Sequence, residues 1–183
     1  MNFARSLRSA LTRYRYPITV ALIATPLFVL YTYPYANQGT PDLAMRRYLA
    51  GYARMVGVVL SVFEKGVVVT DNQIIGHAFS MRIVKTCDAM EVKILLAAAL
   101  AGFPMPWVRR CIAVLVAIVT LVGLNTFRLC VLYWVGARSQ AWFERGHQTL
   151  APLFLVGGAL MTFWLLLPKR RPPVEPIKAA AST

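Results

Sequence analysis

Residues 111–135 read CIAVLVAIVTLVGLNTFRLCVLYWV and carry a single charged side chain, Arg128. A helix of about 20 predominantly apolar residues crosses the ~30 Å hydrocarbon core of a bilayer. The stretch therefore predicts a transmembrane helix, and it sets the class of the whole protein. Asn125 lies three residues before Arg128, so both side chains share one face of that helix.

The composition of the chain agrees with a lipid environment. Of 183 residues, 58% are hydrophobic and 15% are charged, and the mean hydropathy is +0.57. A soluble domain carries about 25% charged residues, and a disordered chain is far less apolar. The net charge of +13 is spread between apolar stretches, not gathered among stacking aromatics. We therefore expect an integral membrane protein with lipid, and not nucleic acid, as its partner.

Three more apolar stretches accompany the first one. We expect transmembrane helices at about 17–35, 88–106, 111–135 and 149–167. The fold class is thus an all-α polytopic membrane protein with about four transmembrane helices. Residues 17–167 form a single membrane-embedded domain between a basic N-terminus, 1–16, and a proline-rich tail, 168–183, which is expected to be flexible.

The distribution of basic residues predicts the orientation. Four arginines precede the first stretch, Arg109 and Arg110 separate the second from the third, and Lys169 begins a basic tail. The positive-inside rule then places both termini in the cytoplasm of a bacterial inner membrane. A cleaved signal peptide is the alternative, but the first stretch is too long for one and lacks a small-residue cleavage site.

The segment between the first two stretches is expected outside the cytoplasm. Leu43–Phe63 alternates apolar positions with Arg46, Arg47 and Arg54, which predicts an amphipathic helix lying on the membrane surface. Gly66–Val84 holds two β-rich pieces on either side of Asp71-Asn72, which predicts a small extracytoplasmic β-hairpin.

Three residues that could carry chemistry reach the same depth in this topology. Cys87 opens the second predicted helix at its outer end, and His147 precedes the fourth, also outside. Arg128 lies about 17 residues, or about 26 Å, above the cytoplasmic start of the third helix. A thiolate nucleophile, a histidine acid/base and an arginine that stabilises an oxyanion together favour acyl transfer.

Each of these residues also has an ordinary structural explanation. A free cysteine is usually packed as a small apolar group, an intramembrane arginine can pair with another helix, and a lone histidine can be merely interfacial. Arg128 carries the strongest single signal because a charge inside an apolar helix is costly. Asn125 beside it strengthens the prediction of a polar site.

Other polar residues have weaker or supporting roles. Asp88 and Glu91 lie close to Cys87, and Glu91 could orient His147 or hold a substrate cation. His77, Cys111 and Cys130 are expected to be structural. Two distant histidines and three scattered cysteines predict no metal site, and no cofactor motif is present.

The residues that carry this chemistry resemble those of the exosortase/archaeosortase family. Cys87-Asp88-Ala89-Met90-Glu91 opens one apolar helix, Asn125-Thr126-Phe127-Arg128 lies in the next, and His147 precedes the last. Over residues 66–165 the chain is most similar to the small exosortase H type. It departs at Ala89, where the commoner family pattern has glycine.

The resemblance implies a polytopic cysteine protease or transpeptidase. Cys87 would be the nucleophile, Arg128 the stabilising cation and His147 the acid/base, acting through a thioester near the outer face of the membrane. The implied substrates are secreted proteins that end in a short motif, a transmembrane helix and a basic cluster.

Other functions stay open. The sequence leaves hydrolysis and transfer as alternatives, and it predicts no oligomeric state. In a rival interpretation the chain is a non-catalytic membrane assembly subunit or a small-solute carrier in which Arg128 binds an anion. A redox role is less favoured, because Cys87 has no resolving cysteine nearby.

Overall fold

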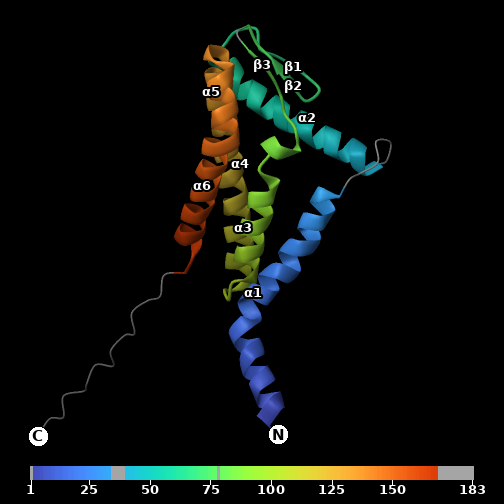
Figure 1. The fold of residues 1–183 in the computed structure, drawn as a ribbon, viewed down its shortest axis with the longest axis vertical. Coiled ribbons are helices and arrows are strands. Elements are labelled where there is room, and N and C mark those ends of the chain that lie inside the picture. Colours follow the sequence, from blue (N-terminus) through green and yellow to red (C-terminus); the bar gives the residue numbers. More distant parts are fainter. Residues whose placement is uncertain (1, 34–39, 78, 169–183) are drawn as a thin grey trace, which may run out of the picture.

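The chain is a bundle of helices with a small β-sheet at one end (Figure 1). The computed structural model describes residues 2–33, 40–77 and 79–168, with side chains from residue 14 onward except at 40–42. Residues 169–183 of the tail predicted at 168–183, and the last two residues of the helix predicted at 17–35, lie outside the described residues. The elements are, in chain order, α1 (Asn2–Thr32), α2 (Thr40–Ser61), β1 (Val68–Thr70), β2 (Gln73–Ile75), β3 (Ser80–Arg82), the 3₁₀ turn η1 (Lys85–Cys87), α3 (Met90–Gly102), α4 (Trp107–Arg138), α5 (Gln140–Arg145), the π-helical turn η2 (Gly146–Leu150) and α6 (Ala151–Leu166).

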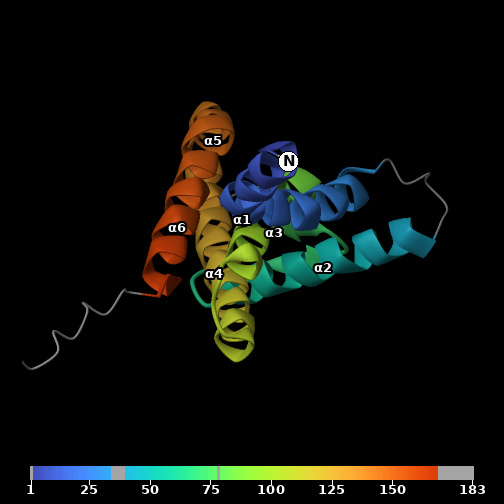
Figure 2. The same cartoon turned by 90° about the horizontal axis from the view of Figure 1, so that it is seen from below.

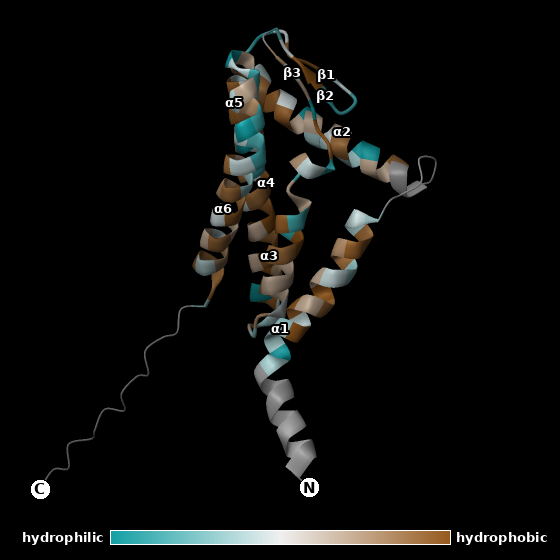
Figure 3. Ribbon diagram, in the orientation of Figure 1, coloured by the Kyte–Doolittle hydropathy of each residue, from teal (hydrophilic) through white to brown (hydrophobic). Residues whose placement is uncertain are grey.

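Three helical segments are long and apolar enough to cross a membrane. Within the described residues they are Tyr14–Thr32, Trp107–Arg138 and Gln140–Leu166. Apolar residues cover much of α3, α4 and α6 in Figure 3. The chain is therefore a helical membrane protein, as the composition predicts.

The helix predicted at 88–106 is shorter than expected and does not qualify as a full span. α3 has 13 residues, so its axis is about 20 Å long. It cannot begin earlier because Ala89 adopts the left-handed conformation, with φ 55° and ψ 31°. It ends before Phe103, whose extended backbone precedes Pro104, because a residue before proline disfavours the helical conformation.

The first and last helices are longer than predicted. α1 begins at Asn2, so residues 2–16 of the basic segment are helical and continuous with the first predicted span. Pro17 and Pro26 lie inside α1, which changes direction along its length in Figure 1. The helix predicted at 149–167 continues back through η2 and α5 to Gln140, where the extended Ser139 separates it from α4.

The spanning helices pack around α3 and α4. α1 contacts α3, α3 contacts α4, and α6 contacts both α3 and α4. Figures 1 and 2 show α1 and α6 on opposite sides of the α3–α4 pair. One apolar cluster fills this region, and its buried residues are Leu96, Leu100, Met105, Ala113, Ala117, Leu121 and Ala159.

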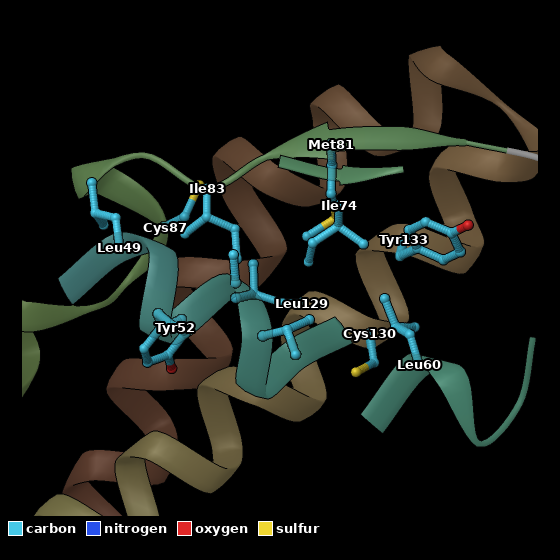
Figure 4. Close-up of a cluster of buried hydrophobic side chains, with 12 residues drawn as sticks. Leu49, Tyr52, Leu60, Ile74, Met81, Ile83, Cys87, Leu129, Cys130 and Tyr133 are labelled. Atoms are coloured by element: carbon cyan, nitrogen blue, oxygen red, sulfur yellow. The ribbon is translucent and has the colours of Figure 1, made fainter. Parts of the chain in front are cut away.

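The predicted amphipathic helix at 43–63 corresponds to α2. It lies across one end of the bundle in Figure 1, with Arg46, Arg47 and Arg54 exposed. Its opposite face packs on the sheet and on α4 in a second apolar cluster, the α2 cluster (Figure 4). The buried residues of this cluster are Leu49, Tyr52, Ala53, Val56, Leu60, Ile74, Met81, Ile83, Cys87, Leu129, Cys130 and Tyr133.

The predicted β-hairpin is a three-stranded antiparallel sheet in the order β1-β2-β3. The two β-rich pieces of the sequence do not pair with each other, because β2 lies between them. Val69 is opposite Ile74, and Ile74 is opposite Met81. Buried Ile74 and Met81 belong to the α2 cluster, so the sheet packs against α2 and supports the segment that leads to Cys87.

Candidate active site

The three residues expected to carry chemistry come together at the sheet end of the bundle. Cys87 ends η1, Arg128 lies on α4, and His147 lies in η2. Cys87 and His147 line one cavity of about 270 Å³. Arg128 Nη2 lies 3.4 Å from His147 Nδ1, and the Asn125 side chain hydrogen-bonds both Arg128 and the Cys87 carbonyl. Three distant parts of the sequence thus form one polar cluster.

Asn125 is the centre of the hydrogen-bond network in this cluster. Its side chain is fully buried, at 0% exposure. Its Nδ2 donates to the Tyr52 hydroxyl at 2.7 Å and to the Cys87 carbonyl at 2.9 Å. Its Oδ1 accepts from Arg128 Nη1 at 3.0 Å. One amide therefore ties α2, η1 and α4 together and uses both donor hydrogens and its acceptor oxygen.

Arg128 is almost completely buried, with 6% of its surface exposed. Its Nη1 donates to Asn125, and its Nη2 donates to His147 Nδ1 over 3.4 Å. Its buried Nε has no hydrogen-bond partner among the described residues. A donor at Nδ1 matches a neutral imidazole that carries its proton on Nε2.

His147 does not precede the last helix as predicted but lies inside it, in the π-helical turn. A π turn adds a residue to the helical repeat, and such turns are frequent at functional sites. The His147 ring stacks on Phe143, with centroids 5.8 Å apart and planes 1° apart. The π turn and this stacking fix the direction of the imidazole toward α4.

Cys87 does not open α3, contrary to the prediction. It ends η1, and Asp88 and Ala89 separate it from the first residue of α3. The thiol is buried in the α2 cluster on one side and lines the cavity on the other.

Ala89 occupies a backbone position that favours glycine. A left-handed conformation costs an ordinary L-residue about 1–2 kcal/mol, whereas glycine adopts it freely. The conformation turns the chain from η1 into α3 directly after the cysteine. Glycine would therefore suit this position better than alanine.

Asp88 has a structural place beside the site. It is fully buried, and its Oδ1 accepts hydrogen bonds from the Met90 N–H at 2.9 Å and from the Tyr31 hydroxyl at 3.0 Å. The Tyr31 hydroxyl also lies 2.6 Å from the Lys85 carbonyl. Asp88 therefore joins α1 to the start of α3 and holds the turn that carries Cys87.

Glu91 lies apart from the other predicted site residues. Its exposed side chain lines a separate groove of about 610 Å³ between α1, α3 and α6, which is otherwise almost entirely apolar. It does not line the cavity that holds Cys87 and His147. The structure thus does not bring Glu91 to His147.

Several residues near the site were not predicted from the sequence. Tyr52 accepts the hydrogen bond from Asn125, and burial raises its pKa, which keeps the hydroxyl protonated. Lys93 is 6% exposed on α3, with Nζ 3.4 Å from the Tyr48 hydroxyl and 5.1 Å from the centre of the Tyr52 ring. A lysine inside an apolar stretch is itself a signal that could have singled it out.

The residues expected to be structural lie outside this network. Cys111 is exposed and Cys130 is buried in the α2 cluster. The His77 backbone N–H donates to Glu64 Oε1 at 3.0 Å. Across the described part of the chain, no group of three or more His, Cys, Asp or Glu residues is arranged to hold a metal ion.

Comparisons of the chain with protein-family models, with curated proteins and with solved structures found no match.

Proposed function

We propose that this chain is a membrane-embedded cysteine peptidase or transpeptidase of the exosortase type, which cleaves the C-terminal sorting signals of secreted proteins. The observation that carries the proposal is the shared cavity of Cys87 and His147, with Arg128 hydrogen-bonded to the imidazole and joined through Asn125 to the Cys87 carbonyl. A nucleophile, an acid/base and an oxyanion donor are the three groups that acyl transfer requires.

The proposed reaction begins with attack of the Cys87 sulfur on the scissile carbonyl. The thiol proton passes to the imidazole of His147, and the carbonyl oxygen becomes an oxyanion that accepts hydrogen bonds from Arg128. The imidazolium then protonates the leaving amine, the C–N bond breaks, and a thioester remains on Cys87. Water or an amine attacks the thioester, which releases the thiol and the processed protein.

Arg128 changes its partner in this scheme. At rest its Nη2 donates to His147 Nδ1, the nitrogen that has a free lone pair in this tautomer. When the oxyanion takes that donor, Nδ1 becomes available to a proton. Arrival of the carbonyl thus couples oxyanion stabilisation to activation of the histidine.

The proposed setting is the bacterial inner membrane, with the site facing outward and both termini in the cytoplasm. Arg109 and Arg110 lie in the first turn of α4, at the opposite end of this helix from the site, and the positive-inside rule supports a cytoplasmic place for that end. In the proposed topology α3 is a short fourth crossing, which runs from the sheet end to the segment before α4 (Figure 1).

The test compares wild type, Cys87→Ala and Cys111→Ala with a secreted reporter from the same source that ends in a motif, an apolar helix and a basic cluster. Cys111 is an exposed cysteine at the far end of α4, so its variant controls for thiol loss. We expect wild type and Cys111→Ala to shorten the reporter and Cys87→Ala to leave it intact. The mass of the new C-terminus distinguishes hydrolysis from transfer.

The buried Nε of Arg128, which has no hydrogen-bond partner in the described part of the chain, favours one other function, an anion-binding membrane assembly subunit or carrier. In that case an abundant, inserted reporter stays full length with wild type and with both variants, and Cys87→Ala keeps the cellular phenotype of wild type. That outcome would overturn the peptidase proposal.

A further inference from the structure

β3 is an edge strand of the sheet, and it borders the cavity of Cys87 and His147. The sheet order β1-β2-β3 leaves β3 paired with β2 on one side only. All three residues of β3 line the cavity together with residues of α4, α5 and η2, whereas no described residue of β1 or β2 lines it. The sheet lies at the α5 end of the bundle in Figure 1. The unpaired edge of the sheet and the proposed nucleophile therefore border one space.

The register of β3 shows which backbone groups point to its unpaired edge. The Ile83 N–H donates to the Asn72 carbonyl at 2.8 Å, and the Phe79 carbonyl accepts from the N–H of the residue after β2 at 3.0 Å. Both bonds point to the β2 side, and successive residues of an antiparallel strand turn their N–H and C=O groups to opposite sides. Ser80 and Arg82 therefore turn theirs to the unpaired edge. Within the described ranges, no hydrogen bond reaches the backbone of either residue from that side.

The side chains of β3 leave this edge open. Met81 is buried in the α2 cluster, and the exposed Arg82 guanidinium lies on the Gln73 amide across the β2–β3 pair. Side chains of successive strand residues alternate between the two faces of a sheet. The feature that residues 79–82 share along the cavity is therefore their backbone edge. It offers alternating N–H and C=O groups to a ligand that can pair with both.

The edge has a fixed position relative to the proposed catalytic residues. At its start the Phe79 ring packs on Phe143 of α5, with centroids 5.2 Å apart, and Phe143 stacks on His147. Beyond its end the Cys87 N–H donates to the Val84 carbonyl at 2.8 Å. A chain that pairs with the edge is thus held between the thiol and the imidazole.

We propose that the substrate binds as an added β-strand on the free edge of β3, which brings its scissile carbonyl to Cys87. This inference rests on the proposed peptidase function and deepens it by defining how the substrate is recognised, as an extended peptide through its main chain. An extended backbone presents N–H and C=O groups with the same period of two as Ser80 and Arg82. Close to lipid these groups need hydrogen-bond partners, and the edge of β3 supplies them.

The direction of the added strand follows from the proposed topology. β3 runs toward Cys87, and the chain then continues into α3. A substrate that comes from outside and ends in a membrane helix runs the same way past the site. The added strand is therefore parallel to β3, and the substrate residues that pair with Ser80 and Arg82 are those before the scissile bond.

The first test removes one donor of the edge. Ser80→Pro deletes the outward N–H, which β2 does not use, whereas Ser80→Ala deletes only an exposed hydroxyl. We expect Ser80→Pro to lower kcat/KM for the reporter about tenfold and Ser80→Ala to stay within about twofold of wild type. Thermal unfolding in detergent identifies the folded variants. Equal kcat/KM values for the two folded variants overturn the proposal.

The second test leaves the protein unchanged and decides the question even where Ser80→Pro does not fold. Synthetic peptides with the motif, apolar helix and basic cluster of the reporter are cleaved by wild type in proteoliposomes. Each carries one N-methylated residue, and the two residues that flank the cut are left unmodified. We expect about tenfold losses of rate at alternate positions before the cut, and little change between them or after the cut. Losses at every position before the cut, or at none, overturn strand addition.

The outcomes separate this inference from the function on which it rests. Cleavage that depends on Cys87 but shows no alternation refutes strand addition and leaves the peptidase function standing. Absence of any Cys87-dependent cleavage refutes both. A second copy of the chain is the other possible occupant of the edge. If Ser80→Pro turns a wild-type dimer into a monomer and leaves cleavage unchanged, the edge joins two copies and the proposal is wrong.

Discussion

Arg128 Nη2 on α4 lies 3.4 Å from His147 Nδ1 in the π turn, across 19 residues of chain. The same guanidinium donates through Nη1 to Asn125 Oδ1 at 3.0 Å. One planar group therefore spans two acceptors, an amide oxygen on its own helix and a ring nitrogen in the π turn. A single side chain thus links His147 to the amide that also holds the Cys87 carbonyl.

Replacement of Arg128 by lysine should be nearly as harmful to cleavage as its removal. An ammonium keeps the charge but cannot span Asn125 and His147 in a fixed plane. We expect Arg128→Lys and Arg128→Gln both to lower kcat/KM for the reporter by about 10²–10³, because each loses an oriented oxyanion donor. Reporter kinetics with purified, folded variants measure this, and a lysine variant with more than a tenth of wild-type activity would contradict the role.

Removal of the Tyr52 hydroxyl should weaken the hydrogen-bond network of Asn125 without abolishing it. In Tyr52→Phe, Asn125 Nδ2 still donates to the Cys87 carbonyl but loses the hydroxyl oxygen that accepts its other hydrogen at 2.7 Å. We expect a loss of about 1 kcal/mol in the free energy of unfolding. Thermal unfolding in detergent checks this, with Tyr14→Phe, an exposed hydroxyl away from the site, as the control. Equal melting temperatures for the two variants would show that the hydrogen bond contributes nothing.

Asp88 should matter for folding more than for chemistry. Asp88→Ala removes the acceptor of the Met90 N–H and of the Tyr31 hydroxyl at a fully buried position. We expect a destabilisation of about 2–3 kcal/mol. Asp88→Asn keeps an oxygen for both donors and should lose less. Chemical or thermal unfolding of the two variants provides the measurement, and the reverse ranking would point to a role for the negative charge.

Glu91 should be dispensable for the reaction itself. It lines the apolar groove of α1, α3 and α6 instead of the cavity at Cys87. We expect Glu91→Gln to keep kcat for the reporter within about twofold of wild type, since no transition-state contact is lost. A hundredfold fall in kcat at normal abundance would instead support the predicted role of Glu91 in orienting His147.

A glycine at position 89 should stabilise the protein. The left-handed conformation of Ala89 strains an alanine by about 1–2 kcal/mol, and Ala89→Gly relieves most of that strain. We expect a gain of about 1 kcal/mol in the free energy of unfolding. Ala97→Gly, the same change in the middle of α3, should cost about 1 kcal/mol. Opposite shifts in melting temperature confirm the backbone argument, and two losses reject it.

Some predictions from the sequence agree with the structure and others do not, and particular residues explain the difference. The helix around 111–135 is confirmed, as α4, because a long apolar run has only one stable form in lipid. The helix at 88–106 is shorter than predicted, because the hydropathy of a segment does not depend on the left-handed turn at Ala89 or on the helix end before Pro104. The hairpin is a sheet of three strands because period and composition do not specify which β-rich pieces pair.

The sequence by itself determined that this is a helical membrane protein and that Cys87, Arg128 and His147 belong to one end of it, because hydropathy, helical rise and charge bias act locally along the chain. Only the tertiary structure decided that His147 lies in a π turn against Arg128, that Asn125 joins Tyr52 to Cys87, and that Cys87 and His147 line one cavity. These contacts join residues far apart in the chain. Their geometry follows from how the helices and the sheet pack, and local patterns do not encode that packing.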